Sequence, residues 1–379
     1  MRMDVRFLVT RDVEDLPDDG VIVMVDGTVP SWTPRRQDAH WDHHRPGGAM
    51  VQMDEMPPIA DDTALIDSLV TGGPVTIVTP LLDADACVAA VWLFLTGRDL
   101  RAGPQRAGDI LRAVAFDCDH LGVPEELSDL GSLATGIVAS LKVVSQKRRR
   151  AGRSQSASDC FEHAVTWLLA AATGQSPWPG QHGEACEYWA GHEKAVGALI
   201  RESRVSIVNG ACIVDVRTLD TFVDARAVNR AADAVYATAQ EGACEAKPEM
   251  EKIVLTVRDM PLSKHVEHPG FRFTLGQRCR PLDPSTVDFT HRGVWQALSE
   301  AEATRSSVSV DAVRAAWNRP TIEKHLGISV WGGRGLVGGS GWTSPSRLLP
   351  NEVLDVVSTH LANTSDRNSE MTLCETVSG

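Results

Sequence analysis

Two segments in the first ninety residues concentrate side chains that can bind a metal ion. Residues 40–44, HWDHH, place three histidines and an aspartate within five positions. Residues 83–86, DADA, place two carboxylates two positions apart. Neutral imidazole binds manganese, iron or zinc, and carboxylate oxygen suits magnesium and manganese. The two segments predict a metal centre, provided that the fold brings them together.

The aspartate pair stands where a strand is expected to give way to a helix. VTIVTP at 75–80 is a β-branched run, and the helical pattern of 83–97 ends at Gly97. Carboxylates in such a turn are stabilised by the helix dipole and by unpaired N–H groups. Asp83 and Asp85 could be helix caps only, and that alternative stays open. Their place after a strand and the histidine-rich segment upstream favour a metal site.

The histidine-rich segment is expected in a loop or at a strand end. His43 and His44 are adjacent, so a regular helix could not turn both toward one metal. The alternative is an exposed polar loop. A third candidate is the FDCDH segment at 116–120, near a helix end. Asp117 and Asp119 are about 200° apart on a helix, so we expect at most one of them at a shared site.

The elements that must position these residues have an α/β pattern. VRFLV at 5–9, VIVMV at 21–25 and VTIVTP are predicted strands, and helices are predicted over 60–73, with Asp61 and Asp62 as caps, and over 108–124. Strands that alternate with helices favour a parallel sheet, which binds its ligands beyond the carboxyl ends of the strands.

The rest of the chain predicts a helical connector and a second α/β domain. Helices are expected over 133–144, 157–174 and 183–202, and the basic, Ser-rich stretch 146–158 is interpreted as a solvated loop, with phosphate capture by Lys147 to Arg153 as its alternative. VSIVNGACIVDV at 205–216 predicts a hairpin at Asn209-Gly210, followed by a helix over 224–240 and strands over 251–259 and 327–333.

The fold class is therefore α/β, in four segments. They are a parallel-sheet N-terminal domain (1–145), a helical connector (146–203), a smaller mixed-sheet α/β domain (204–362) and a disordered tail (363–379).

Composition excludes several classes of protein. Hydrophobic residues make up 43% and charged residues 23%, as in globular proteins with a core. The net charge of −13 argues against nucleic acid beyond a short oligonucleotide. The eight cysteines contain no CxxC pair, and neither a signal peptide nor an 18-residue apolar span is present, so a cytoplasmic protein without a membrane partner is expected.

These motifs resemble those of the DHH-type phosphoesterase superfamily, as a divergent member with a DHHA1-like C-terminal domain. Asp83-Ala84-Asp85-Ala86 matches the first motif of that family, Asp42-His43-His44 looks like its name-giving motif, and Asp117 or Asp119 could stand for its lone aspartate. The resemblance implies two manganese ions (or Mg²⁺ or Fe²⁺) that activate a water to attack a phosphoester. The implied metal ligands and catalytic groups are Asp26, His40, Asp42, His43, Asp83, Asp85, Asp117 and Asp119, with His44 orienting the water and Asp85 acting in catalysis.

Two departures from the family pattern bear on the metal ligands. Leu81 stands where the family has a histidine, and the Asp-His-His triplet precedes the DxDA segment instead of following it. Asp26, which ends the strand VIVMV, is expected to take a metal position that the family fills elsewhere.

A glycine-rich segment near the C-terminus looks like the family's substrate-binding segment. Backbone N–H groups there could form an anion nest, with Arg334 supplying charge and Arg45 assisting from the N-terminal domain. The expected substrate-binding residues are Gly332, Gly333, Arg334, Gly338, Gly339 and Ser340. The alternative is a turn whose Trp331 and Trp342 pack into the core. His265 and His268 are a further histidine pair, interpreted as part of a surface loop.

The sequence as a whole predicts a metal-dependent phosphoesterase that hydrolyses a small phosphorylated molecule in the cleft between two domains. A homodimer is compatible with it. Two alternatives remain: a non-hydrolytic, metal-dependent enzyme of a specialised biosynthetic pathway, and a non-catalytic metabolite-binding protein.

Overall fold

The computed structural model divides the chain into two compact units, Met1–Ala190 and Gly191–Gly379. The domain boundaries expected at 145 and 203 stay predictions, and the tail 363–379 lies outside the described residues. No helix in the described part of the chain is both long and apolar enough to cross a bilayer. The structure describes residues 5–42, 50, 56–102, 106–150, 156–180, 183–219, 223–239, 249–259, 270–278, 287–317, 322–333, 335–341 and 344–361.

The first unit is built on a parallel sheet with the strand order β1-β4-β2-β3. The strands are β1 (Val5–Val9), β2 (Val21–Val25), β3 (Ala39–Trp41) and β4 (Val75–Thr79). Three of them were predicted, and all pairs are parallel as expected. Every residue of β2 and β4 is buried, which explains their unbroken β-branched sequences. The short strand β3, AHW, has no such run and was not predicted as a strand.

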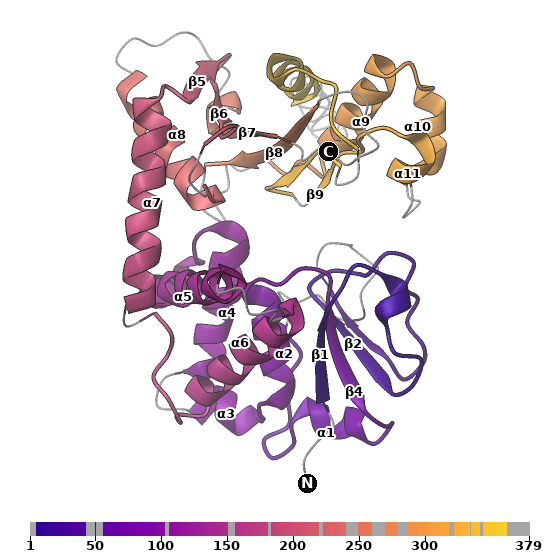
Figure 1. Ribbon diagram of the computed structural model, residues 1–379, viewed down its shortest axis with the longest axis vertical. Helices are drawn as coiled ribbons and strands as arrows, with labels where there is room; N and C mark the ends of the chain where they lie inside the picture. The colour runs from indigo at the N-terminus through magenta and orange to yellow at the C-terminus, as the bar shows by residue number, and fades with distance from the viewer. Residues whose placement is uncertain are drawn as a thin grey trace, which may run out of the picture. The chain divides into compact units, whose positions relative to one another are not determined.

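Helices cover one face of this sheet (Figure 1). Val21, Val23 and Val25 of β2 pack into the main core with α2, α4 and α6, whereas Ile22 and Met24 join a smaller cluster with Val29 on the opposite face. The elements of this unit are η1 (Val13–Asp15), α1 (Leu65–Val70), α2 (Ala84–Phe94), α3 (Gly97–Ala102), α4 (Ala107–His120), η3 (Glu125–Leu130), α5 (Gly131–Arg150) and α6 (Ala157–Ala172). Helix α7 (Gly183–Arg201) spans the division between the units.

Three local predictions for this unit are wrong. Helix α1 starts after Ala64 without a side-chain cap, and Asp61 pairs instead with Arg101 of α3. Helix α2 ends at Phe94 rather than Gly97, which begins α3. Residues 146–150 of the stretch expected to be a loop are helical, because α5 continues to Arg150, and residues 151–155 lie outside the described residues. The side chains of Lys147 to Arg153 lie outside the described residues.

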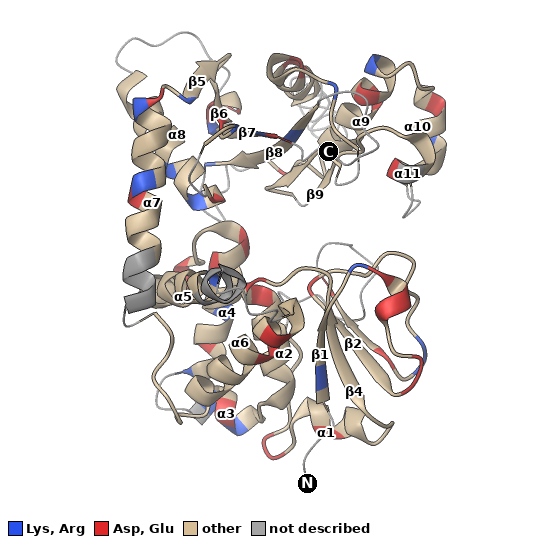
Figure 2. Cartoon of the chain, in the orientation of Figure 1, with Lys and Arg blue, Asp and Glu red and all other residues tan. Residues whose placement is uncertain are grey.

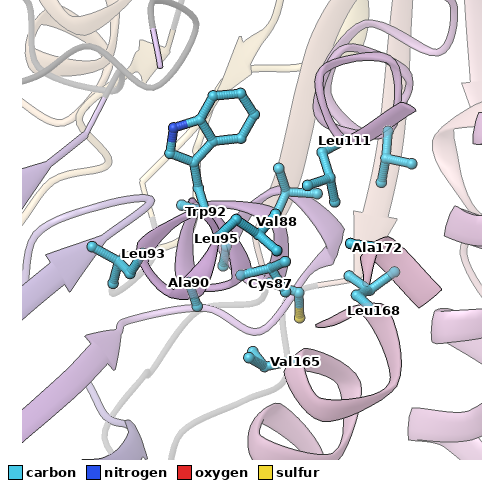
Figure 3. Close-up of a cluster of buried hydrophobic side chains, with 14 of the residues drawn as sticks. Cys87, Val88, Ala90, Trp92, Leu93, Leu95, Leu111, Val165, Leu168 and Ala172 are labelled. Atoms are coloured by element: carbon cyan, nitrogen blue, oxygen red, sulfur yellow. The ribbon is translucent and has the colours of Figure 1, made fainter. Parts of the chain in front are cut away.

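Helix α2 is the most enclosed helix described in this unit. All residues from Ala84 to Leu93 are buried. Figure 3 shows Cys87 and Val88 among Leu111 of α4 and Leu168 of α6. The Trp92 indole N–H also donates to the carbonyl of Pro57 at 3.1 Å. A helix packed on several sides cannot shift without opening the core, so its first turn is held in a fixed place.

The second unit contains a mixed sheet with the order β5-β6-β7-β8-β10-β9. The predicted hairpin is confirmed, since Asn209 (φ 52°) and Gly210 (φ 89°) join β5 and β6 in left-handed conformations. The strand predicted over 327–333 is reduced to β9. The strands are β5 (Val205–Val208), β6 (Ala211–Asp215), β7 (Ile253–Asp259), β8 (Phe271–Gln277), β9 (Gly332–Gly333) and β10 (Gly338–Gly339), and the helices are α8 (Ala225–Ala239), η5 (Met250–Lys252), α9 (Val294–Arg305), α10 (Val310–Ala316) and α11 (Ile322–Leu326).

Among the described residues, the core of the second unit encloses the carboxylate of Glu302 on α9. It accepts hydrogen bonds from the Trp331 indole N–H at 3.2 Å, the Arg347 backbone N–H at 3.1 Å and the Ser346 hydroxyl. Trp331 itself is buried and stacks on Phe273 with 5.6 Å between the ring centres, as the core alternative predicted. The carboxylate therefore ties α9 to the segments that flank the glycine-rich strands.

Candidate metal centre

Three aspartates meet at the carboxyl edge of the parallel sheet. Asp26 directly follows β2, and Asp83 and Asp85 lie at the start of α2, after β4. Each offers a carboxylate oxygen within 4.8 Å of the other two. Acidic residues at the start of α2 are visible in Figure 2. We call Asp26, Asp83 and Asp85 the aspartate cluster.

The backbone of each segment explains why these carboxylates converge. Asp26 is in the left-handed region (φ 49°), and its N–H donates to the Trp41 carbonyl of β3 at 2.9 Å. Gly27 follows at φ 118°, and a Cβ there would lie 2.6 Å from the Pro80 side chain. Only glycine allows this chain reversal, so the loops after β2 and β4 can approach each other. Asp83 is the N-cap of α2, as the cap alternative expected, and accepts from the Ala86 N–H at 3.4 Å.

The electrostatics of the aspartate cluster are unfavourable without a cation. Burial of its carboxyl, and then the negative charge of Asp26, raise the pKa of Asp83 well above its usual range, although part of this residue reaches solvent. Protonation of Asp83 relieves the repulsion between its carboxyl and that of Asp26. A divalent cation could replace that proton. The all-oxygen set fits Mn²⁺ or Mg²⁺.

Two cysteine thiols lie close enough to the aspartate cluster for its negative charge to affect their pKa. Burial, followed by the charges of Asp83 and Asp85, raises the pKa of Cys87 and of Cys118 well above the usual range for a thiol. Both cysteines are therefore thiols rather than thiolates at neutral pH.

The histidine-rich segment begins in β3, whose last residues are His40 and Trp41. Trp41 is in register with Val25 of β2, which places Asp42 beside Asp26 at the same edge. His40 and Asp42 are buried, at 3% and 0% exposure. His43, His44 and Arg45 lie outside the described residues, so their roles stay predictions.

Thr28 is a residue at this edge that the sequence did not single out. Its hydroxyl lies 2.8 Å from Nε2 of His40 and donates to Oδ2 of Asp42 at 2.8 Å. The His40 ring also packs edge-on against Trp32, with 5.3 Å between the ring centres. In the sequence, Thr28 is only a threonine two residues after the aspartate that follows β2. Its contacts with His40 and Asp42 could be expected only once the pairing of β2 with β3 is known.

The two aspartates of α4 differ in their surroundings. Asp117 is buried and accepts from the Thr135 hydroxyl of α5 at 2.8 Å. The charge of Asp119 is among the causes that raise the pKa of Asp83. Which of the two aspartates would join a shared site stays a prediction.

Leu81 brings no ligand to the site through its side chain, which is 46% exposed. Its carbonyl accepts from the Thr79 hydroxyl at 2.7 Å, which holds the start of the loop that leads to Asp83. The position therefore contributes no side-chain ligand, and the nearby carboxylates are those of the aspartate cluster.

The glycine-rich segment forms a narrow part of the second sheet. Gly332 and Gly333 pair with Gly338 and Gly339 as β9 and β10. The Ser340 hydroxyl accepts from the Phe273 N–H at 2.9 Å. A Cβ at Gly333 would lie 2.2 Å from the Gly338 Cα, so glycine is required by close strand contact. A role in substrate binding stays a prediction. Arg334, Trp342, His265 and His268 lie outside the described residues.

The carboxylate of Glu323 on α11 adjoins the same segment. It accepts from the Ser344 N–H at 2.7 Å, and a Cβ on Gly341 would collide with it. The Ser344 N–H, which lies near the expected anion nest, therefore already donates to a carboxylate of the protein.

No protein-family model matches the chain, and no curated protein matches it. Among solved structures, it is similar to a pGpG-specific phosphodiesterase, PggH, from Vibrio cholerae, with 10% identity, a TM-score of 0.37 and coverage of 93% of this chain and 86% of that one. It is also similar to an exopolyphosphatase-related protein from Bacteroides fragilis, with 8% identity, a TM-score of 0.28 and coverage of 91% and 92%. Likenesses at this level say nothing of substrate or metal.

Proposed function

We propose that the protein is a metal-dependent phosphoesterase that hydrolyses a small phosphorylated molecule. The observation that carries the proposal is the aspartate cluster, with three carboxylate oxygens within 4.8 Å at the carboxyl edge of a parallel sheet. Ligands of such sheets bind at this edge. Manganese is the metal we expect, with Mg²⁺ or Fe²⁺ as the other candidates.

Each residue of the site has a proposed role. Asp26, Asp83 and Asp85 would hold the cation, and Asp42 would complete the ligand set from the end of β3. Bound metal lowers the pKa of water toward neutrality and polarises a phosphoryl oxygen. His43 and His44 are proposed as a ligand and as the group that orients the water. The acidity of the site requires the metal to be present before an anionic phosphate can approach.

A non-hydrolytic, metal-dependent enzyme is the second candidate. The specific observation in its favour is Leu81, an apolar and exposed side chain in the position of a family ligand. An altered ligand set changes the metal that a site prefers. This candidate predicts bound iron or zinc and no phosphate release from any ester.

The first experiment measures metal content by inductively coupled plasma mass spectrometry. Wild type should carry about one or two manganese ions per chain after supply of Mn²⁺, as expected for a one-metal or two-metal site. The Asp83→Asn/Asp85→Asn double variant should carry none while keeping its circular dichroism spectrum. Asp109→Asn, a partly exposed α4 aspartate paired with Arg106, is the matched control and should keep the metal.

The second experiment measures phosphate release from phosphomonoesters and from a short oligonucleotide. Asp85→Asn should abolish turnover without loss of fold. Full activity of Asp85→Asn, or wild type that binds no metal at all, would overturn the proposal. Ligand-induced stabilisation without metal or turnover would instead indicate a metabolite-binding protein.

A further inference from the structure

The Thr28 hydroxyl links His40 to Asp42 through two hydrogen bonds whose donors and acceptors can be assigned. A hydroxyl has a single hydrogen, and Thr28 gives it to Oδ2 of Asp42 at 2.8 Å. The contact of the same oxygen with Nε2 of His40, at 2.8 Å, must then be an N–H that donates to Thr28. The order of donation is therefore His40 to Thr28 to Asp42. Because the hydrogen sits on Nε2, that nitrogen has no lone pair to offer a cation.

The backbone places Thr28 for this contact. Asp26 and Gly27 both have positive φ, and the reversal they produce turns the chain after β2 back toward the end of β3. Thr28 thus lies two residues after a member of the aspartate cluster and touches the carboxylate of the neighbouring strand. The register of β2 with β3 places Asp42 opposite Asp26 on the neighbouring strand, at a backbone spacing of about 4.8 Å.

We infer that Thr28 is a positioning residue that fixes the carboxylate plane of Asp42 for the cation, and that His40 supports Thr28 instead of binding the cation through Nε2. The inference rests on the proposed function and revises the expectation that His40 is a metal ligand. A carboxylate with one oxygen held by a hydroxyl has lost its free rotation before metal arrives. Partners of this outer kind typically change metal affinity by roughly ten-fold to a hundred-fold when they are removed.

The test compares Thr28→Val, which keeps the shape and removes the hydroxyl, with Thr28→Ser, which restores the hydroxyl. Mn²⁺ affinity is measured by titration, with free Mn²⁺ followed by electron paramagnetic resonance. Thr28→Val should bind Mn²⁺ roughly ten-fold to a hundred-fold more weakly than wild type, and Thr28→Ser should bind within about three-fold of it. Thr28→Ala serves as a second hydroxyl deletion with no steric demand, in case valine does not fold.

Thr10→Val is the matched control. Thr10 stands at the end of β1 and its hydroxyl also donates to an aspartate, Asp15, which is outside the aspartate cluster. Its loss should leave the Mn²⁺ affinity unchanged. Equal weakening in Thr10→Val and Thr28→Val would mean that the loss of any buried hydroxyl loosens the sheet edge, and would overturn the specific role of Thr28.

The role of His40 has its own readout in the nitrogen couplings of bound Mn²⁺, measured by pulsed electron paramagnetic resonance. His40→Gln should leave these couplings unchanged, because glutamine keeps an N–H donor and no His40 nitrogen touches the metal. Loss of a coupling would show direct ligation and overturn the inference. If wild type binds no Mn²⁺, the proposed function falls together with it. If wild type binds and Thr28→Val binds equally well, the role of Thr28 alone is refuted.

Discussion

Replacement of Asp83 by asparagine should stabilise the metal-free protein and remove its response to manganese. Asparagine has nearly the volume of aspartate and is an equally good N-cap, so the bond to the Ala86 N–H can survive. What changes is the charge. The pKa of Asp83 is raised by burial and by the negative charge of Asp26, which means that its ionised form is held at a cost in free energy.

The size of the effect follows from the spacing of the oxygens. Two unit charges 4.8 Å apart repel by about 3 kcal/mol at an effective dielectric constant of 20. Partial protonation of the cluster relieves part of this, so neutralisation of one member should raise the free energy of unfolding by about 1–3 kcal/mol. In a unit of this size that corresponds to a rise of about 2–12 °C in melting temperature.

The assay is thermal unfolding at pH 7.5, once with EDTA and once with Mn²⁺. Wild type should gain about 2.7 kcal/mol from Mn²⁺ at a hundred times its dissociation constant, whereas Asp83→Asn should gain almost nothing. The Asp109→Asn control, at a partly exposed position, should change little in EDTA and keep the full Mn²⁺ response. A lower melting temperature of Asp83→Asn in EDTA, or an undiminished Mn²⁺ response, would refute the reasoning.

Three further predictions concern pH, the loop after β2 and the second unit. Because burial and the neighbouring charge raise the pKa of Asp83 in the folded state, the metal-free fold binds the Asp83 proton more tightly than the unfolded chain does. The free energy of unfolding of wild type, relative to that of Asp83→Asn, should therefore fall as pH rises from about 4 through the raised pKa. Urea unfolding at several pH values measures this. Gly27→Ala should weaken Mn²⁺ binding and destabilise the fold by about 1–3 kcal/mol, measured by titration and urea unfolding, because the new Cβ would meet Pro80 and the backbone has φ 118°. Glu302→Leu should cost about 2–4 kcal/mol in urea unfolding with EDTA and Mn²⁺ alike, since it strands three donors far along the chain from the aspartate cluster; a dependence on Mn²⁺ would contradict this.

The parallel sheet and the place of the cluster could be predicted because their signals are local. The valine-rich runs of β2 and β4 identify buried strands, and the step from β4 into Asp83 identifies a helix N-terminus at the carboxyl edge. Asp26 was also found in this way, as the residue that ends a predicted strand. Confirmation of the hairpin at Asn209-Gly210 has the same origin in local conformational preference.

What escaped prediction depends on contacts between segments that are distant in the chain. The strand β3 is only AHW, and it exists because it pairs with β2. Thr28 acquires its importance from that same pairing. The cap expected for α1 failed because Asp61 contacts Arg101, forty residues away, instead of the helix beside it. Side-chain partners of this kind leave no periodic trace in a sequence.

The way in which the chain treats its other buried carboxylates supports the metal reading of the aspartate cluster. Burial alone would raise the pKa of Asp38, but hydrogen bonds from Arg35 and from the Ile22 N–H outweigh it and lower that pKa below its usual range. Glu302 accepts from three donors, which offset part of the effect of its burial, although burial still raises its pKa. For Asp83, by contrast, the charges nearest to its carboxyl are further carboxylates. Elsewhere the fold surrounds its buried carboxylates with hydrogen-bond donors, but at the start of α2 it brings three carboxylates together. The positive charge that would balance them has to come from a ligand. A divalent cation that prefers oxygen ligands supplies this charge.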